Sequence, residues 1–214
     1  MPRKPAPPRP TLVLFVRHGH TPTTGKVLPG RAPGLHLSDD GRAQAVAVAD
    51  RLAALKSVDA IYASPLERTR ETAAAIASAR GLKVTAERGL LEADIGDWTG
   101  LELKAVRRLP EWKAVQSYPS GFRFPGGESF LEMQTRVVAA VARLRDRHPG
   151  QTVVAVSHAD PIKAALGHAL GTHLDFFQRF TVSPCSVSAV TYADGGPLVL
   201  SINSVGDLKA LRPS

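Results

Sequence analysis

A small set of histidines, arginines and one glutamate stands out, because together these side chains could move a phosphoryl group. Arg17 and His18 end one apolar run, Arg68 follows a second, Glu92 lies in a later loop, and His158 ends another run. An arginine guanidinium group matches the oxygens of a phosphate, and a neutral imidazole can attack phosphorus. A carboxyl group with a raised pKa can protonate the departing alkoxide. These residue types predict phosphoryl transfer through a covalent phosphohistidine.

The charge that develops during phosphoryl transfer explains why such residues would act together. Negative charge spreads over the transferring group, so positioned cations contribute most to catalysis, and a positioned proton donor adds roughly 10²–10⁴-fold. His158 precedes a predicted helix, whose free backbone N–H groups also favour phosphate. Each residue alone has a structural explanation, such as a surface charge or a helix cap. Their combination favours catalysis.

Metal chemistry is the alternative for the same residues. His18 with His20, and His158 with Asp160, are spaced as pairs that could bind zinc or iron. The two arginines would repel a cation, however, and no further His or Asp lies near either pair in the sequence. The chain also has no Walker-type glycine-rich loop and no Gly-x-Ser-x-Gly motif. We therefore expect no metal site and no cofactor.

Strands and helices are predicted to alternate along the chain. Apolar, β-branched runs predict strands, and helical patterns opened by Ser-x-x-Glu capping boxes at Ser64 and Ser129 predict helices. This alternation indicates the α/β class, with a mostly parallel central sheet covered by helices on both faces. Predicted strands cover residues 11–17, 58–63, 83–87, 152–157, 186–193 and 197–203, and predicted helices cover 38–56, 64–81, 129–148 and 158–170.

The position of the candidate residues fits this fold class. In open α/β sheets, ligands bind at the carboxyl ends of the strands. Arg17, His18 and His158 stand at strand ends, and Arg68 and Glu92 lie in segments that follow strands. We therefore expect these side chains to converge on one pocket.

Length and composition predict one domain. The 214 residues are 43% hydrophobic and 21% charged, and no apolar run approaches the roughly 18 residues of a membrane helix. We predict a disordered, basic, proline-rich tail at 1–10, without the apolar segment of a secretory signal, a domain at 11–205, and a C-terminal tail at 206–214. A small lid is expected at about 99–126, where aromatic and basic side chains could contact a leaving group or pack as a subdomain.

The net charge of +8 raises two hypotheses, nucleic-acid binding and attraction of a small anionic substrate. The positive residues form no long run and no aromatic-interleaved motif of the kind that binds nucleic acid. We therefore expect a small phosphorylated metabolite, with no nucleic-acid and no membrane partner. The single cysteine, Cys185, excludes an intrachain disulfide, and this fits a cytoplasmic location. Its side chain is expected to be buried.

Several motifs resemble the histidine phosphatase superfamily, in its phosphoglycerate-mutase-like branch. They follow the family's order from about residue 12 to about residue 203. The segment from His158 to Arg179 is similar to an actinobacterial subgroup of phosphomutase-like proteins. The matching motifs are Arg17-His18-Gly19 with Thr21, Leu37-Ser38 with Gly41 and Gln44-Ala45, Ser64-Pro65-Leu66 with Arg68-Thr69, Glu92 with Gly96-Asp97-Trp98, Pro125-Gly126-Gly127-Glu128-Ser129, and Val156-Ser157-His158.

The resemblance implies roles for individual residues. His18 would be the phosphorylated nucleophile and Glu92 the proton donor, while the phosphate would be bound by Arg17, Arg68 and His158. It also implies a three-layer α/β/α sandwich and no metal.

The substrate would be bound by three further positions, Thr24, Gly30 and Ala159. Two of them depart from the family pattern. Thr24 stands where the family often has Asn, although its hydroxyl can still donate one hydrogen bond. Ala159 stands where Gly is usual, which keeps the backbone N–H and reduces the space near the phosphate.

The expected function is hydrolysis of a phosphomonoester by a metal-independent, histidine acid-type phosphatase. A cofactor-dependent phosphoglycerate-type mutase is the alternative. Such mutases have a longer insertion after the acid and a Tyr three residues beyond it, whereas this chain is short between Trp98 and Pro125 and has Ile95. A non-catalytic phospholigand-binding module is a third hypothesis, disfavoured because His18 and Glu92 are both present. The sequence leaves a homodimer open.

Overall fold

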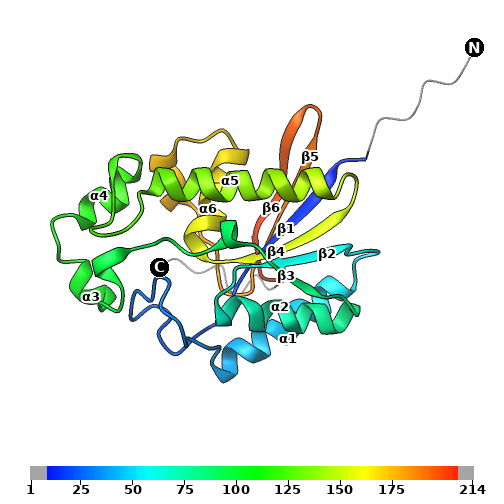
Figure 1. The fold of residues 1–214 in the computed structure, drawn as a ribbon, viewed down its shortest axis with the longest axis horizontal. Helices are drawn as coiled ribbons and strands as arrows, with labels where there is room; N and C mark the ends of the chain where they lie inside the picture. The colour runs from blue at the N-terminus through cyan, green and yellow to red at the C-terminus, as the bar shows by residue number, and fades with distance from the viewer. Residues whose placement is uncertain (1–8, 207–214) are drawn as a thin grey trace, which may run out of the picture.

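One mixed β-sheet passes through the middle of the molecule in the computed structural model, which describes residues 9–206 (Figure 1). Within that range the sheet has six strands in the order β3-β2-β4-β1-β5-β6. The pairs β2–β3, β2–β4 and β1–β4 are parallel, and β1–β5 and β5–β6 are antiparallel. The strands are β1 Thr11–Arg17, β2 Ala60–Ala63, β3 Val84–Ala86, β4 Thr152–Ser157, β5 Val187–Ala193 and β6 Gly196–Ser204.

Helices cover both faces of this sheet (Figure 1). Two of them pack below it and two above it, each pair over its own cluster of buried hydrophobic side chains. This arrangement confirms the predicted three-layer α/β/α sandwich. The lower pair is α1 Asp39–Ala53 and α2 Glu67–Arg80, and the upper pair is α5 Phe130–Arg147 and α6 Ala159–Ala169. Short 3₁₀ helices occupy Arg88–Leu90, Gly96–Trp98, Pro119–Gly121 and Leu174–Arg179.

One predicted capping box is confirmed and the other is wrong. At the start of α5, the Ser129 hydroxyl accepts from the Glu132 backbone N–H, and the Glu132 carboxylate accepts from the Ser129 N–H. At the start of α2, by contrast, the N-cap is Leu66, which makes no side-chain capping bond. The reason is tertiary, because the hydroxyl of the buried Ser64 is engaged by His158.

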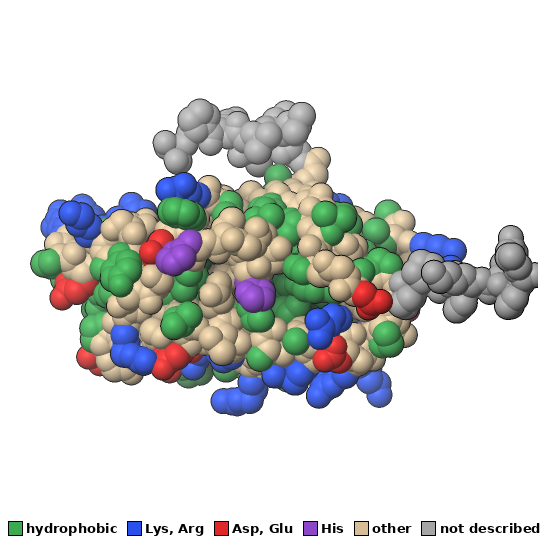
Figure 2. Space-filling model, turned by 90° about the horizontal axis from the view of Figure 1, so that it is seen from above, with side chains coloured by type: hydrophobic (Ala, Val, Ile, Leu, Met, Phe, Trp, Pro, Cys, Tyr) green, Lys and Arg blue, Asp and Glu red, His purple; other side chains and the backbone are tan. Residues whose placement is uncertain are grey.

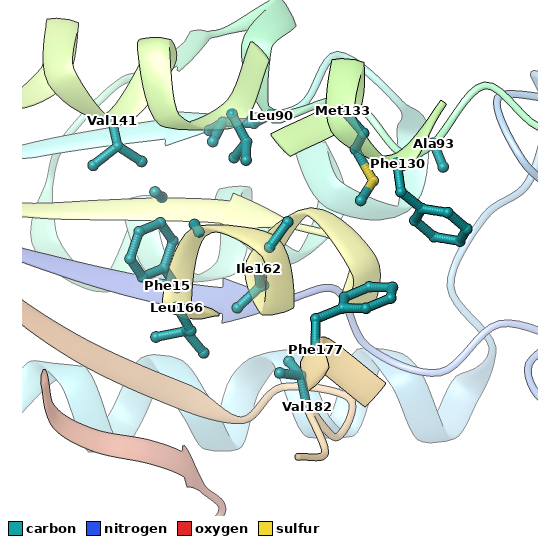
Figure 3. Packing of buried hydrophobic residues seen from close by; sticks show 14 of the residues in the cluster. Phe15, Leu90, Ala93, Phe130, Met133, Val141, Ile162, Leu166, Phe177 and Val182 are labelled. Carbon is teal, nitrogen blue, oxygen red and sulfur yellow. The ribbon is translucent and has the colours of Figure 1, made fainter. Parts of the chain in front are cut away.

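The segment predicted as a lid carries two short helices, α3 Leu103–Val106 and α4 Trp112–Ser117. Its aromatic residues Phe122 and Phe124 are buried and pack against Trp98, with ring centroids 5.6 and 5.4 Å from the indole. The contacts continue into the core, where the rings of Phe130 and Phe177 lie 5.1 Å apart (Figure 3). Phe122 and Phe124 therefore belong to the main hydrophobic core, and closure of the segment over a site stays a prediction.

The surface and the chain ends bear on the remaining predictions. On the face above α5 and α6, Lys and Arg side chains lie mainly along the margins (Figure 2). Across residues 9–206, no helix is long and apolar enough to cross a membrane. Cys185 is buried, as predicted. The predicted N-terminal tail falls largely, and the C-terminal tail almost entirely, outside the described residues.

Candidate active site

Parallel pairing of β1 with β4 brings the two histidines together. The register places Arg17 opposite Ser157, so His18 and His158 follow the two strands at the same sheet edge. The backbone N–H of His18 donates to the Ser157 carbonyl at 3.0 Å. The two imidazole rings lie edge to face, with centroids 5.1 Å apart. The predicted convergence of these residues, which are distant in the sequence, is present.

The imidazole of His18 is held in one orientation and one protonation state. Its Nδ1 lies 2.7 Å from the Gly19 carbonyl oxygen, which can only accept, so Nδ1 carries the proton and the lone pair is on Nε2. The side chain is buried, and this desolvation, reinforced by the charges of Arg17 and Arg68, holds its pKa well below the usual value. The ring is therefore neutral, as an attack on phosphorus requires.

The glycine after His18 is required by close packing. A Cβ at Gly19 would lie 2.5 Å from the Gly41 carbonyl oxygen in the first turn of α1. The Gly19 N–H also donates to the Thr72 hydroxyl at 3.1 Å. These contacts hold the carbonyl that orients His18.

His158 presents one free nitrogen to the same region. It is fully buried, and its Nε2 lies 2.9 Å from the Ser64 hydroxyl. If this hydroxyl donates to Nε2, the proton of the neutral ring lies on Nδ1, which then becomes a donor. Desolvation and the charge of Arg68 hold the pKa of His158 well below its usual value. Ser64 is thus a site residue that local capping rules misassigned.

Each of the two arginines is anchored by a hydrogen bond to a backbone carbonyl. Arg17 Nη1 donates to the Val182 carbonyl at 2.7 Å, and the fully buried Arg68 donates from Nη2 to the Gly30 carbonyl at 2.9 Å. Among residues 9–206, no group accepts from several of their buried nitrogens. These nitrogens are Nε of Arg17 and both Nε and Nη1 of Arg68. Nδ1 of His158 likewise has no hydrogen-bond partner in this range.

Glu92 has the environment of a proton donor. Its side chain is 18% exposed, one oxygen accepts from the Ala93 N–H at 2.9 Å, and the other lies 3.9 Å from His158 Nδ1. Desolvation, followed by the negative charge of Asp160, raises the pKa of Glu92 to about 7 against the attraction of Arg68 and Arg17. A carboxyl group with such a pKa is about half protonated at neutral pH, so it can both give and accept a proton.

The predicted substrate-binding residues differ in what they do. The buried Gly30 contributes a carbonyl to Arg68, as described above. The Thr24 hydroxyl is engaged locally, since it accepts from the Thr21 N–H at 2.9 Å and pairs with the Thr21 hydroxyl. Ala159 is the first residue of α6, directly after His158. Substrate binding by these three residues stays a prediction.

Asp160 is predicted from the sequence only as a possible metal ligand, and the structure indicates another effect. It lies in the first turn of α6, where its charge acts on both Glu92 and Arg17. The sequence feature that could have placed Asp160 in the site is its position two residues after His158. Within the described part of the chain, no three His, Cys, Asp or Glu side chains form a group that could hold a metal ion.

Comparisons with known proteins identify the family of the chain. The family described as the histidine phosphatase superfamily (branch 1) matches residues 13–205. The chain is 35% identical over 196 residues to phosphoserine phosphatase 1 of Hydrogenobacter thermophilus, covering 89% of this chain and 91% of that protein. It is 31% identical over 207 residues to the probable phosphoglycerate mutase GpmB of Salmonella choleraesuis, covering 93% and 94% of the two chains.

A solved structure extends the likeness to three dimensions. Mycobacterial glucosyl-3-phosphoglycerate phosphatase superposes with a TM-score of 0.83 at 25% identity. The match covers 92% of this chain and 100% of that one.

Proposed function

Because the chain belongs to the histidine phosphatase superfamily, we propose that it is a phosphomonoesterase that hydrolyses a small organic phosphate through a phosphohistidine on His18. The relatives named as phosphatases, one for phosphoserine and one for glucosyl-3-phosphoglycerate, support this reaction class. Both names describe phosphate esters of small acidic metabolites. A substrate of that class also suits a chain with a net charge of +8.

One observation carries the proposal. Buried nitrogen donors of Arg17, Arg68 and His158 lack protein acceptors among residues 9–206, beside a neutral imidazole whose lone pair is on Nε2. Burying guanidinium nitrogens without partners is costly, so the arrangement favours an anion that accepts from all of them. A phosphoryl group has the required charge and the required number of oxygens.

In the first step, His18 Nε2 attacks the phosphorus of the bound ester. A nitrogen–phosphorus bond forms, and the bond from phosphorus to the ester oxygen breaks. The protonated Glu92 carboxyl group gives its proton to that oxygen, so the alcohol leaves neutral. Arg17, Arg68 and the Nδ1–H of His158 stabilise the charge on the equatorial oxygens.

In the second step, water attacks the phosphohistidine. The Glu92 carboxylate, now ionised, accepts a proton from this water as the oxygen–phosphorus bond forms. The nitrogen–phosphorus bond breaks, His18 becomes a neutral imidazole again, and inorganic phosphate leaves. Glu92 ends protonated, so the cycle needs no metal ion and no cofactor.

The test measures phosphate release and traps the intermediate. We expect the purified protein to release phosphate from p-nitrophenyl phosphate. Brief incubation with ³²P-labelled ester and alkaline quenching should leave a phosphoryl label that is stable to base and labile to acid. His18→Ala should abolish both signals, whereas His168→Ala, at an exposed histidine of α6, should preserve them. Unchanged phosphate release by His18→Ala would contradict the mechanism.

The mutase alternative has its own assay, since one relative is named a probable phosphoglycerate mutase. In that reaction, phosphohistidine 18 would pass its phosphoryl group to another hydroxyl instead of water. We expect phosphate release from 3-phosphoglycerate to exceed its isomerisation, measured with added 2,3-bisphosphoglycerate. Faster isomerisation than phosphate release would show that the enzyme is a mutase and not a hydrolase. Loss of activity with EDTA would favour the metal hypothesis.

A further inference from the structure

The loop that carries Glu92 is held through its backbone by a network of arginines and acidic side chains. Arg31 Nε donates to the Glu92 carbonyl at 2.8 Å, and Arg136 Nη2 donates to the same carbonyl at 3.3 Å. Arg136 also donates from Nη1 to the carbonyls of Gly89 and Leu91, both at 2.9 Å. Two guanidinium groups from distant parts of the chain thus fix the backbone around the proposed proton donor.

One carboxylate joins the two arginines. Glu128 Oε1 accepts from Arg31 Nη2 at 2.9 Å, from Arg136 Nη2 at 2.7 Å and from the Asp94 N–H at 3.0 Å. Its side chain is 15% exposed, and those of Arg31 and Arg136 are 29% and 23% exposed. Such partly buried, shared ion pairs hold their geometry better than exposed pairs, which contribute little.

The same network reaches the phosphate-binding arginine. Gly30 precedes Arg31, and its carbonyl accepts from Arg68 Nη2 at 2.9 Å. One dipeptide therefore contacts Arg68 through Gly30 and the Glu92 loop through Arg31. Displacement of this dipeptide would change the position of both groups relative to His18.

We propose that Glu128 is a positioning residue of the phosphatase reaction, which holds Arg31 and Arg136 so that the Glu92 carboxyl group faces the leaving oxygen. This inference rests on the proposed function of Glu92. Without the Glu128 charge, the two arginines would lose the counter-ion that they share, and Arg31 would keep only its ion pair with Asp94 at 3.2 Å. The loop would then relax, and proton donation would suffer before phosphate binding does.

The test separates proton donation from general damage through the choice of leaving group. An alkyl phosphate such as glycerol 3-phosphate expels a strongly basic alkoxide and needs the acid, whereas 2,4-dinitrophenyl phosphate expels a weak base and does not. The readout is kcat/KM, which reports the steps up to departure of the alcohol and leaves out the hydrolysis of phosphohistidine that both esters share. We expect Glu128→Gln to lower kcat/KM on the alkyl ester by roughly 10²-fold and on the dinitrophenyl ester by less than about 5-fold. Glu92→Gln should show the same selective pattern, and Glu128→Asp, which keeps the charge, should regain part of the loss.

The matched control is Glu132→Gln, because Glu132 is a nearby exposed glutamate whose capping bond glutamine can keep. It should leave kcat/KM on both esters unchanged. Equal loss on both esters in Glu128→Gln, or no loss on either, would overturn the proposal. If Glu128→Gln fails to fold, Arg31→Lys and Arg136→Lys provide the same comparison with charge retained, and the same two results would overturn it. A wild-type protein without activity, or Glu92→Gln without selectivity, would instead refute the proposed function.

Discussion

Replacing Glu92 by glutamine should stabilise the protein at alkaline pH while it impairs catalysis. The carboxyl group has its pKa raised from an ordinary value of 4.5 to about 7, first by desolvation and then by Asp160. Below pH 4.5 the carboxyl group is protonated in both the folded and the unfolded state, so it adds nothing to the pH dependence of the free energy of unfolding. Between 4.5 and about 7 only the folded state holds it, and stability therefore falls as pH rises.

The size of this effect follows from the difference between the two pKa values. Each unit corresponds to about 1.4 kcal/mol, which sets an upper limit of about 3 kcal/mol above pH 7. A glutamine at position 92 cannot ionise and escapes this cost. Glu92→Gln should thus match the wild type at pH 4 and exceed its free energy of unfolding by up to about 3 kcal/mol at pH 8.5.

Urea unfolding of both proteins at pH 4, 7 and 8.5 measures this difference, and other titrating groups cancel in the comparison. On alkyl phosphates the same variant should lose roughly 10²–10⁴-fold in kcat. Parallel pH dependences of stability in the two proteins would refute the assignment of Glu92 as a desolvated acid. Retained kcat on alkyl phosphates would refute its role as proton donor.

Other substitutions test the neighbouring groups. Arg68→Lys loses the guanidinium donors Nε and Nη1 and should lower kcat/KM by roughly 10²–10³-fold, measured with p-nitrophenyl phosphate. Asp160→Asn removes the charge that raises the pKa of Glu92, while Arg68 and Arg17 still lower it, so the alkaline limb of kcat/KM should move to lower pH. Gly30→Ala places a Cβ 2.7 Å from Ile95 at a φ of +49° and should cost about 1–3 kcal/mol in urea unfolding.

Each of these substitutions has a control and a contradicting result. Gly34→Ala also has a positive φ, of +76°, but meets open space, so the Gly30 variant should be destabilised more. Asp50→Asn, at an exposed position of α1, should leave the alkaline limb in place. An unmoved limb in Asp160→Asn would exclude Asp160 from tuning Glu92. Full activity of Arg68→Lys would show that a single ammonium group suffices at that position.

Local sequence patterns correctly predicted two kinds of element. One kind is a strand formed by a continuous apolar run, and the other is a helix start whose capping residues are close in sequence. The strands β1 and β4 are buried apolar runs, and the capping box at Ser129 closes within one helical turn. The capping box predicted at Ser64 is absent, because the hydroxyl of Ser64 bonds instead to His158. A local rule cannot anticipate a partner supplied by another strand.

Residue types and motif order were enough to predict the α/β sandwich, the family and the convergence of His18, Glu92 and His158. The reason is that the residue types a reaction needs, and the hydrophobic periods of strands and helices, are properties of the sequence alone. The structure alone decided which nitrogen of His18 carries the proton, how far the pKa of Glu92 rises, and that Glu128 links two arginines to the acid's loop. Hydrogen bonds, desolvation and Coulomb interactions depend on distances between segments that are far apart in sequence, and only the packed fold sets those distances.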